Sequence, residues 1–173
     1  MQFSYDVEYT SYVQQSIDNF FQYYKKRFGR KKPIFVCIGT SKVPGDAIGP
    51  YVGTILSNLD NSLTVYGTVD FPVHAANADL FARKLWIKNF FNRPIIAVDA
   101  CIGNSPLGTI WCLESSGIKP GKACGRDLDY IGNTAIMVTT TDDPAKLTTV
   151  DDDMIRRVSA IISSRIYENL LTL

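Results

Sequence analysis

Hydrophobic positions occur along the chain in two kinds of run, either at helical spacing or in short unbroken stretches. The spaced runs predict amphipathic helices, and the unbroken stretches predict buried strands. The predicted helices span about residues 12–28, 47–58, 77–91 and 150–171. The predicted strands span about residues 33–39, 63–69, 93–100, 107–113 and 133–138. This alternation predicts one α/β domain over residues 1–173, a three-layer sandwich with a mostly parallel central sheet.

Residue types at the ends of these runs predict where the elements begin and end. Thr10 or Ser11 is expected to cap the first helix, and Gly29 is expected to end it. The last helix is expected to follow a threonine cap at position 148 or 149, with the acidic residues 151–153 in its first turn. We therefore interpret this acidic run as helix-end charge rather than as a metal cluster. The strand at 107–113 follows a short loop and is expected to be antiparallel.

Composition and charge narrow the classes of partner. The 173 residues are 46% hydrophobic, which suits one globular domain and argues against disorder. The net charge of +1 provides no basic field for nucleic acid, and the basic run 25–32 is interpreted as a solvated helix end. No apolar run reaches the roughly 18 residues of a membrane span. The four cysteines form no Cys-x-x-Cys pair and no signal peptide is recognised, so reduced thiols and a cytoplasmic location are expected.

A turn rich in glycine and proline, residues 37–50, joins the first strand to the second helix. Its spacing matches neither Gly-x-Gly-x-x-Gly nor the P-loop pattern. Its carboxylate, Asp46, lies beyond a strand end, where ligands bind in open α/β sheets. The helix is expected to begin at Ala47, with Pro50 in its first turn, or at Pro50 itself. In both cases a positive helix end lies near Asp46 and is expected to favour its ionised form.

A second carboxylate, Asp99, is predicted to end the third strand. If the first and third strands are neighbours, Asp46 and Asp99 meet at one edge of the sheet. Such a pair can share a proton and activate water, bind a divalent cation, or only accept hydrogen bonds from loop amides. The residue types alone leave these three roles open.

Four further residues are predicted at the same edge. His74 follows the second strand as a candidate ligand, base or hydrogen-bonded loop residue. Thr40 and Lys42 belong to the glycine-rich turn and are candidates for steadying a carboxylate or an oxyanion. Cys101 follows Asp99 by two residues and is a weaker candidate for a nucleophile, because no base is placed beside it.

Seven short segments, taken in order, resemble the YyaC sporulation proteins. They are CIGT at 37–40, GDAIGP at 45–50, VYGT at 65–68, PVHA at 72–75, IIAVDACIG at 95–103, GTI at 108–110 and KPG at 119–121. That family in turn resembles the spore germination protease and, more distantly, the hydrogenase maturation endopeptidases. The resemblance implies a phosphorylase/hydrolase-like fold and a catalytic aspartate pair, which the motifs carry onto Asp46 and Asp99.

The same resemblance also raises a metal-binding alternative. In the hydrogenase maturation enzymes, acidic residues at these two places bind a nickel-type metal together with a histidine further along the chain. Here His74 is the only histidine and precedes Asp99, so the expected state is no cofactor, with a divalent metal on Asp46, Asp99 and His74 as the alternative. In the loop after Pro120 and Gly121, Gly125 and Arg126 stand where the YyaC family usually has Asn-Lys.

The leading hypothesis is a sporulation-associated endopeptidase in which Asp46 and Asp99 activate water. Backbone amides of the turn at Gly39, or Lys42, are expected to stabilise the oxyanion. The expected partner is a peptide or protein substrate in the spore-forming cell, in the forespore or spore core, with homo-oligomerisation left open. The alternatives are a non-catalytic sporulation protein that binds or scaffolds with the same fold, and a metal-binding maturation-type endopeptidase.

Overall fold

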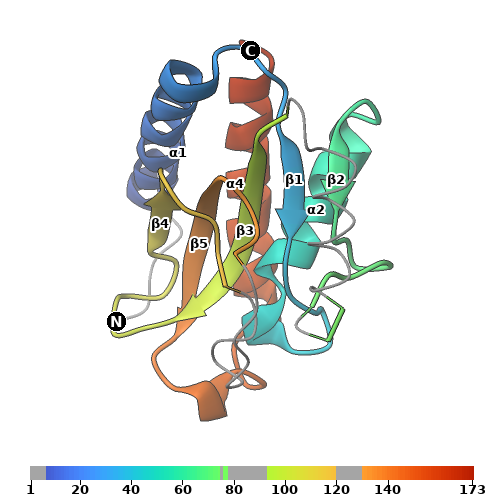
Figure 1. Cartoon of the computed structure of the whole chain (residues 1–173). Helices are drawn as coiled ribbons and strands as arrows, with labels where there is room; N and C mark the ends of the chain where they lie inside the picture. Colours follow the sequence, from blue (N-terminus) through green and yellow to red (C-terminus); the bar gives the residue numbers. More distant parts are fainter. Residues whose placement is uncertain (1–6, 75, 78–92, 120–129) are drawn as a thin grey trace.

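Five short strands form one sheet in the order β2-β1-β3-β5-β4 (Figure 1). The computed structural model describes residues 7–74, 76–77, 93–119 and 130–173. The strands are β1 Ile34–Cys37, β2 Thr64–Tyr66, β3 Ile95–Ile102, β4 Ile110–Leu113 and β5 Thr134–Thr141. The helices are α1 Val7–Phe28, α2 Ile48–Leu59 and α4 Asp152–Leu170, with short 3-10 turns η1 Pro44–Asp46 and η3 Pro144–Lys146.

The sheet is mostly parallel, as the unbroken apolar runs predict. β1 pairs in parallel with β2 and with β3, and β3 pairs in parallel with β5. Only β4 is antiparallel, because a short loop joins it to β3 and returns it along β5. All four residues of β1 are buried, as expected of a strand that is covered on both faces. The predicted α/β class and the antiparallel strand are confirmed.

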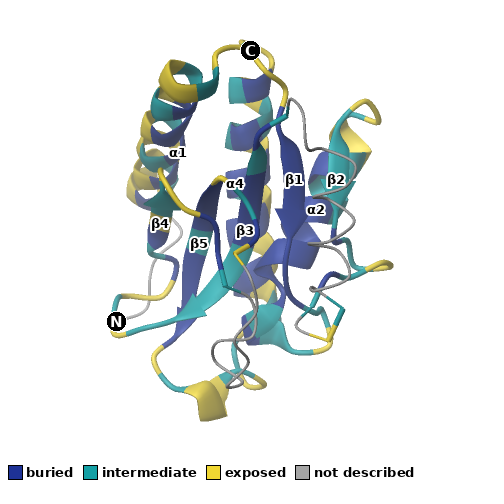
Figure 2. Cartoon of the chain, viewed as in Figure 1, coloured by how far each residue is buried: buried dark blue, intermediate teal, exposed yellow. Residues whose placement is uncertain are grey.

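The three described helices pack on one face of the sheet, with α4 between α1 and α2. Alternate residues of the strands, among them Phe35 and Ile96, join the helices in the larger core. Because both faces of the sheet are covered, β1 is dark blue along its whole length in Figure 2. The intervening residues, such as Val36 and Ala97, form a smaller core on the opposite face. The helix predicted at 77–91 as part of the third layer lies almost entirely outside the described residues.

Helix and strand ends depart from the prediction at several points. α1 begins at Val7, upstream of both predicted caps, whereas Gly29 does end it, with a φ of 68° and its N–H donating to the Lys25 carbonyl over 2.9 Å. Neither threonine caps α4. Its cap is Asp151, whose carboxylate accepts from the N–H of Asp153 over 3.0 Å. The acidic run is therefore confirmed as a helix-end feature.

β1 lies at the point where the strand order reverses. The chain passes from β1 through α2 to β2 on one side, and then returns to β3 on the other side of β1. In open α/β sheets a crevice forms at such a point, beyond the carboxyl ends of the two central strands. β1 and β3 are neighbours, which meets the condition under which Asp46 and Asp99 are expected to lie at one edge of the sheet.

No helix in the described part of the chain is long and apolar enough to cross a membrane.

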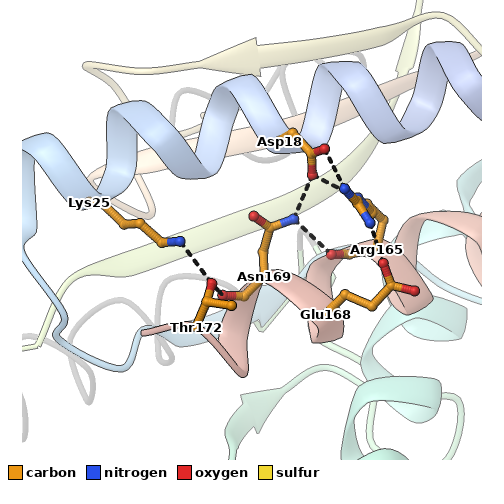
Figure 3. A network of polar contacts seen from close by, with 6 residues as sticks. All are labelled: Asp18, Lys25, Arg165, Glu168, Asn169 and Thr172. Atoms are coloured by element: carbon orange, nitrogen blue, oxygen red, sulfur yellow. Dashed lines mark hydrogen bonds and ion pairs between the residues drawn. The ribbon is translucent and has the colours of Figure 1, made fainter.

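A polar network ties α1 to α4 behind the sheet (Figure 3). Asp18 of α1 accepts hydrogen bonds from the Arg165 guanidinium, including one from Nε over 2.7 Å, and from Asn169 Nδ2 over 2.8 Å. Arg165 also pairs with Glu168. The hydrogen bond from Arg165 is the largest influence on Asp18 and holds the pKa of its carboxyl below the ordinary value.

We expect Asp18→Asn to lower the free energy of unfolding at pH 7 by about 1 kcal/mol, because it removes a partly screened ion pair. A carboxyl whose pKa is lowered by folding stabilises the fold above its unfolded pKa, and this stabilisation is lost as pH falls through the folded pKa. The difference between wild type and variant should therefore disappear in acid. Urea unfolding at pH 7 and pH 3 measures it. Glu168→Gln is the control. Because the Glu168 side chain is more exposed than that of Asp18, this variant should lower the free energy of unfolding by less than Asp18→Asn does.

Candidate functional site

The glycine at position 39 lets the chain leave β1 sharply enough to form the site. The N–H of Ile38 still donates to the Val98 carbonyl of β3, and the N–H of Gly39 then donates to the Val73 carbonyl, both over 2.7 Å. Gly39 has a φ of 130°, and a Cβ there would lie 2.0 Å from the carbonyl oxygen of Asp46. Any other residue would therefore push Asp46 out of place.

Asp46 is held from several directions at once. The N–H of Thr40 donates to both the carbonyl oxygen and the carboxylate Oδ2 of Asp46, each over 3.0 Å. Its neighbour Gly45 donates from N–H to the Leu147 carbonyl over 2.8 Å. Gly45 also accepts from the buried Thr140 hydroxyl of β5 over 2.6 Å. Asp46 is thereby held by the turn that precedes it and, through Gly45, by segments that follow it about a hundred residues later.

Asp99 lies inside β3 rather than at its end, which corrects the prediction. β1 stops pairing with β3 at Val98, so Asp99 is the first residue of β3 beyond that pairing. It pairs with Met137 of β5, and Oδ1 of its carboxylate accepts from the N–H of Ala100 over 2.8 Å. Asp99 therefore lies at the mouth of the crevice although its strand continues beyond it.

One pocket of about 860 Å³ brings the predicted residues together. Asp46, Asp99, His74 and Cys101 all line it. Much of its remaining described wall is apolar and includes Ile38, Val43, Ile102, Leu113, Ile118, Tyr130, Met137 and Leu147. This volume lies within the range of ordinary ligand sites. A second cavity, of about 520 Å³, lies beside α2 and is lined by neither Asp46 nor Asp99.

Burial raises the pKa of both aspartates. Desolvation raises the pKa of Asp46 to about 6, against smaller opposing effects from the Thr40 N–H and from His74. The net pKa of Asp46 thus lies above its ordinary value, and the expected contribution of the helix end stays a prediction. Desolvation, and secondly the charge of Asp46, raise the pKa of Asp99 well above its ordinary value. The two carboxyls therefore interact electrostatically, and they differ in protonation near neutral pH.

His74 is oriented by its own loop. Its Nδ1 accepts from the N–H of Ala76 over 3.3 Å, and its backbone N–H donates to Oδ1 of Asn77 over 2.8 Å. The neutral ring therefore carries its proton on Nε2. No group of three or more His, Cys, Asp or Glu side chains is arranged to hold a metal ion within the described segments. The alternative metal site on Asp46, Asp99 and His74 is therefore not preformed in this geometry.

The remaining predicted residues differ in their contribution. Thr40 acts through its N–H on Asp46, and its hydroxyl oxygen accepts from the Lys42 N–H over 3.3 Å. Lys42 itself is absent from the described wall of the pocket. Cys101 does line the pocket, but burial raises the pKa of its thiol, which lies 3.6 Å from the Thr139 hydroxyl. Cys101 is thus a neutral thiol in this site.

The expected oxyanion donors of the glycine-rich turn are already occupied. The N–H of Gly39 donates to Val73 and that of Thr40 donates to Asp46. These two amides are therefore not available to an oxyanion in this conformation, whereas the predicted roles of the other amides of the turn and of Lys42 stay predictions. The raised pKa of Asp99 makes its protonated carboxyl a further candidate donor.

Sequence reasoning missed Thr140. The predicted strand ended at residue 138, whereas β5 continues to Thr141. The signal was present, because the run of threonines at 139–141 is β-branched and suits a strand. What no pattern along the chain indicates is that the Thr140 hydroxyl reaches Gly45, 95 residues earlier.

Comparison with known proteins gives one family match and one curated relative. A family model described as "Protein of unknown function (DUF1256)" matches residues 6–163. Over 107 residues the chain is 37% identical to "Uncharacterized protein YyaC" of Bacillus subtilis (strain 168). That alignment covers 61% of this chain and 52% of the relative, so the chain spans about half the length of the protein it matches. The resemblance to YyaC proteins is confirmed.

Two solved structures share part of the arrangement. One is a [NiFe] hydrogenase maturation protease, HycI, from Thermococcus kodakarensis KOD1, with a TM-score of 0.46 and 16% identity. It covers 83% of this chain and 98% of its own. The other is an uncharacterized protein from Wolinella succinogenes, with a TM-score of 0.45, 13% identity, and coverage of 79% and 95%. At these scores neither likeness bears on the chemistry of the site.

We expect Thr140→Val to lower the pKa of Asp46 from about 6 toward its ordinary value of 3.8. Loss of the hydroxyl frees the Gly45 carbonyl, and the loosened turn lets water reach the Asp46 carboxylate. An NMR titration of the carboxyl carbon measures the pKa. Thr140→Ser keeps the donor and should leave the pKa near 6. An unchanged pKa in Thr140→Val would show that the turn does not depend on this bond.

We expect Asp46→Asn to raise the free energy of unfolding at pH 8 by about 1–3 kcal/mol, given about 1.4 kcal/mol per pKa unit. Because folding raises the pKa of Asp46, wild-type stability falls as pH rises from about 4 to about 7, and the neutral amide avoids this loss. Denaturant unfolding at pH 4 and pH 8 tests it. Asp70→Asn, at an exposed carboxyl, should show no such gain. A variant less stable than wild type at pH 8 would contradict the assignment.

Proposed function

We propose that this chain, which belongs to the DUF1256 family of proteins of unknown function, hydrolyses peptide bonds by means of an aspartate pair. The observation that carries this proposal is the meeting of Asp46 and Asp99 in one largely apolar pocket at the β1/β3 switch point. Carboxyls that share a desolvated pocket and interact are a recurring means of keeping one acid and one base near neutral pH.

The two aspartates take different roles because their environments differ. Asp46 ionises near pH 6 and, as a carboxylate, removes a proton from a water molecule that attacks the peptide carbonyl carbon. Asp99 keeps its proton and donates a hydrogen bond to the carbonyl oxygen as negative charge develops there. When the C–N bond breaks, the proton held by Asp46 passes to the leaving amine, so Asp46 is again a carboxylate.

His74 has a minor electrostatic effect on Asp46. A charged His74 ring lowers the pKa of Asp46, which opposes burial and favours the base form of that residue. The neutral ring accepts from the Ala76 N–H at Nδ1, a bond that the charged ring, with a proton on Nδ1, would give up. We assign His74 a positioning role through Asp46 rather than a direct catalytic one.

The biological setting is proposed from the same family membership. The sequence match to YyaC of Bacillus subtilis, together with the seven segments that resemble the YyaC sporulation proteins, supports a role in sporulation and a cytoplasmic or forespore location. The substrate would be a peptide or protein of that cell.

Asp46→Asn and Asp99→Asn should each reduce peptide cleavage at least 100-fold, because each removes one half of the acid–base pair. The assay is the release of fluorescent fragments from labelled casein by the purified protein at pH 7. Asp70→Asn, outside this pocket, is the matched control and should cleave at the wild-type rate. Activity should rise as pH increases through about 6, as Asp46 ionises, and fall again once Asp99 loses its proton. Wild-type protein that cleaves nothing, or variants that cleave normally, would overturn the mechanism.

A binding protein without catalysis is the second candidate, favoured by the occupied amides of Gly39 and Thr40. Cells carrying the Asp46→Asn, Asp99→Asn double variant distinguish the two candidates. Normal sporulation and germination in that strain, with failure in a deletion strain, would assign the protein to binding or scaffolding.

A further inference from the structure

One side of β3 is unpaired at the pocket. β1 accompanies β3 as far as the pair Cys37 and Val98, and the last hydrogen bond runs from the Ile38 N–H to the Val98 carbonyl. Gly39 then turns the chain away, while β3 continues to Ile102. No strand in the described part of the chain pairs with this continuing edge.

The alternation of a strand identifies which groups face the open side. Successive residues direct their backbone N–H and C=O to opposite sides of the strand. Val98 faces β1, so Ala100 and Ile102 face the same side, whereas Gly103 donates to Thr141 of β5 over 3.0 Å. The N–H of Ala100 is taken by the Asp99 carboxylate. The Ala100 carbonyl and both polar backbone groups of Ile102 therefore face the pocket, which both residues line.

The outer edge of the sheet is treated differently. On β4, the outward N–H of Ile110 donates to the Tyr12 hydroxyl over 3.1 Å. Just beyond it, the Glu114 carbonyl accepts from the Arg27 guanidinium over 2.7 Å. Such side-chain cover prevents an edge strand from pairing with other chains. Among the described residues, side chains thus cover the edge that faces outward, whereas no strand pairs with the edge that faces the aspartates.

We propose that the open edge of β3 at Ala100–Ile102 binds an unfolded segment of polypeptide, which adds as a strand where β1 stops. The recognition is of peptide backbone, since the Ala100 carbonyl and the Ile102 N–H and carbonyl match the donors and acceptors of an extended chain. A folded protein, whose backbone is already paired, would not fit. An extended segment at this edge lies beside Asp99 in the pocket that Asp46 also lines.

Cleavage of the docked segment rests on the proposed peptidase function, but docking itself can be measured without cleavage. The Asp46→Asn, Asp99→Asn double variant is mixed with fluorescent α-lactalbumin, either reduced and carboxymethylated, and so unfolded, or native. We expect the unfolded form to bind at least tenfold more tightly. Equal binding of both forms, or binding of neither, overturns the proposal.

A backbone scan distinguishes strand addition from other modes of binding. The shortest fragment of the unfolded protein that binds is resynthesised with single N-methyl groups at successive positions. Methylation at every second residue should weaken binding about tenfold or more, since it removes an N–H that faces β3, and the residues between should change it less than about threefold. Losses without this period of two would refute the proposal.

A proline variant tests the same edge from the protein side. Ile102→Pro removes the N–H that faces the pocket and should weaken binding of the fragment about tenfold. Cys112→Pro is the matched control, because the N–H of Cys112 faces outward on β4, as that of Ile110 does, and binding should be unchanged. Circular dichroism confirms that each variant is folded, and the methyl scan alone decides if either is not. Unchanged binding in a folded Ile102→Pro overturns the proposal.

The outcomes for docking and for catalysis are separable. Periodic binding to the double variant, with no cleavage by the wild type, supports the docking edge and refutes the peptidase. Cleavage that depends on Asp46 and Asp99, with no periodicity in the methyl scan, supports the peptidase and refutes the docking edge.

Discussion

The pairing of β1 with β3, and its abrupt end at Val98, is the constraint on which the site depends. While the two strands run together, their apolar side chains fill cores on both faces of the sheet. Where they separate, one strand turns at Gly39 toward Asp46 and the other continues past Asp99. A crevice at the carboxyl ends of parallel strands is a general property of such folds. Here the unequal lengths of the two strands widen it into the pocket.

Carboxyl groups in this pocket are costly for the fold. Each is partly deprived of water, and the charge on one disfavours the charge on the other. The structure meets this cost with hydrogen bonds from backbone amides of Thr40 and Ala100, and with the nearby charge of His74. Ionisable groups whose pKa values are shifted by burial and by neighbouring charges are concentrated at functional sites. This cost separates Asp46 and Asp99 from Asp151–Asp153, whose carboxyls serve a helix end.

The sequence predicted the architecture well because hydrophobic periodicity is a strong local signal. The apolar run of β3 identified a central strand, and the position of Asp46 beyond β1 identified the right edge of the sheet. What it could not predict depends on contacts between distant segments. The raised pKa of Asp46 follows mainly from burial in the pocket, which no local pattern along the chain indicates. Similarly, the extension of β3 beyond Asp99 depends on its pairing with β5. The identity of the α4 cap depends on which of several neighbouring side chains reaches the helix end.

The support of Asp46 by Thr140 and Leu147 has a consequence for synthesis of the protein. Gly45 is held by residues that leave the ribosome about a hundred residues after it. A nascent chain that ends before β5 contains both aspartates, yet lacks the strand that pairs with Asp99 and the groups that fix Asp46. Domains fold largely as units during synthesis. The described arrangement around the two aspartates therefore forms only after Thr140 and Leu147 have been synthesised, and a chain that ends before β5 lacks it.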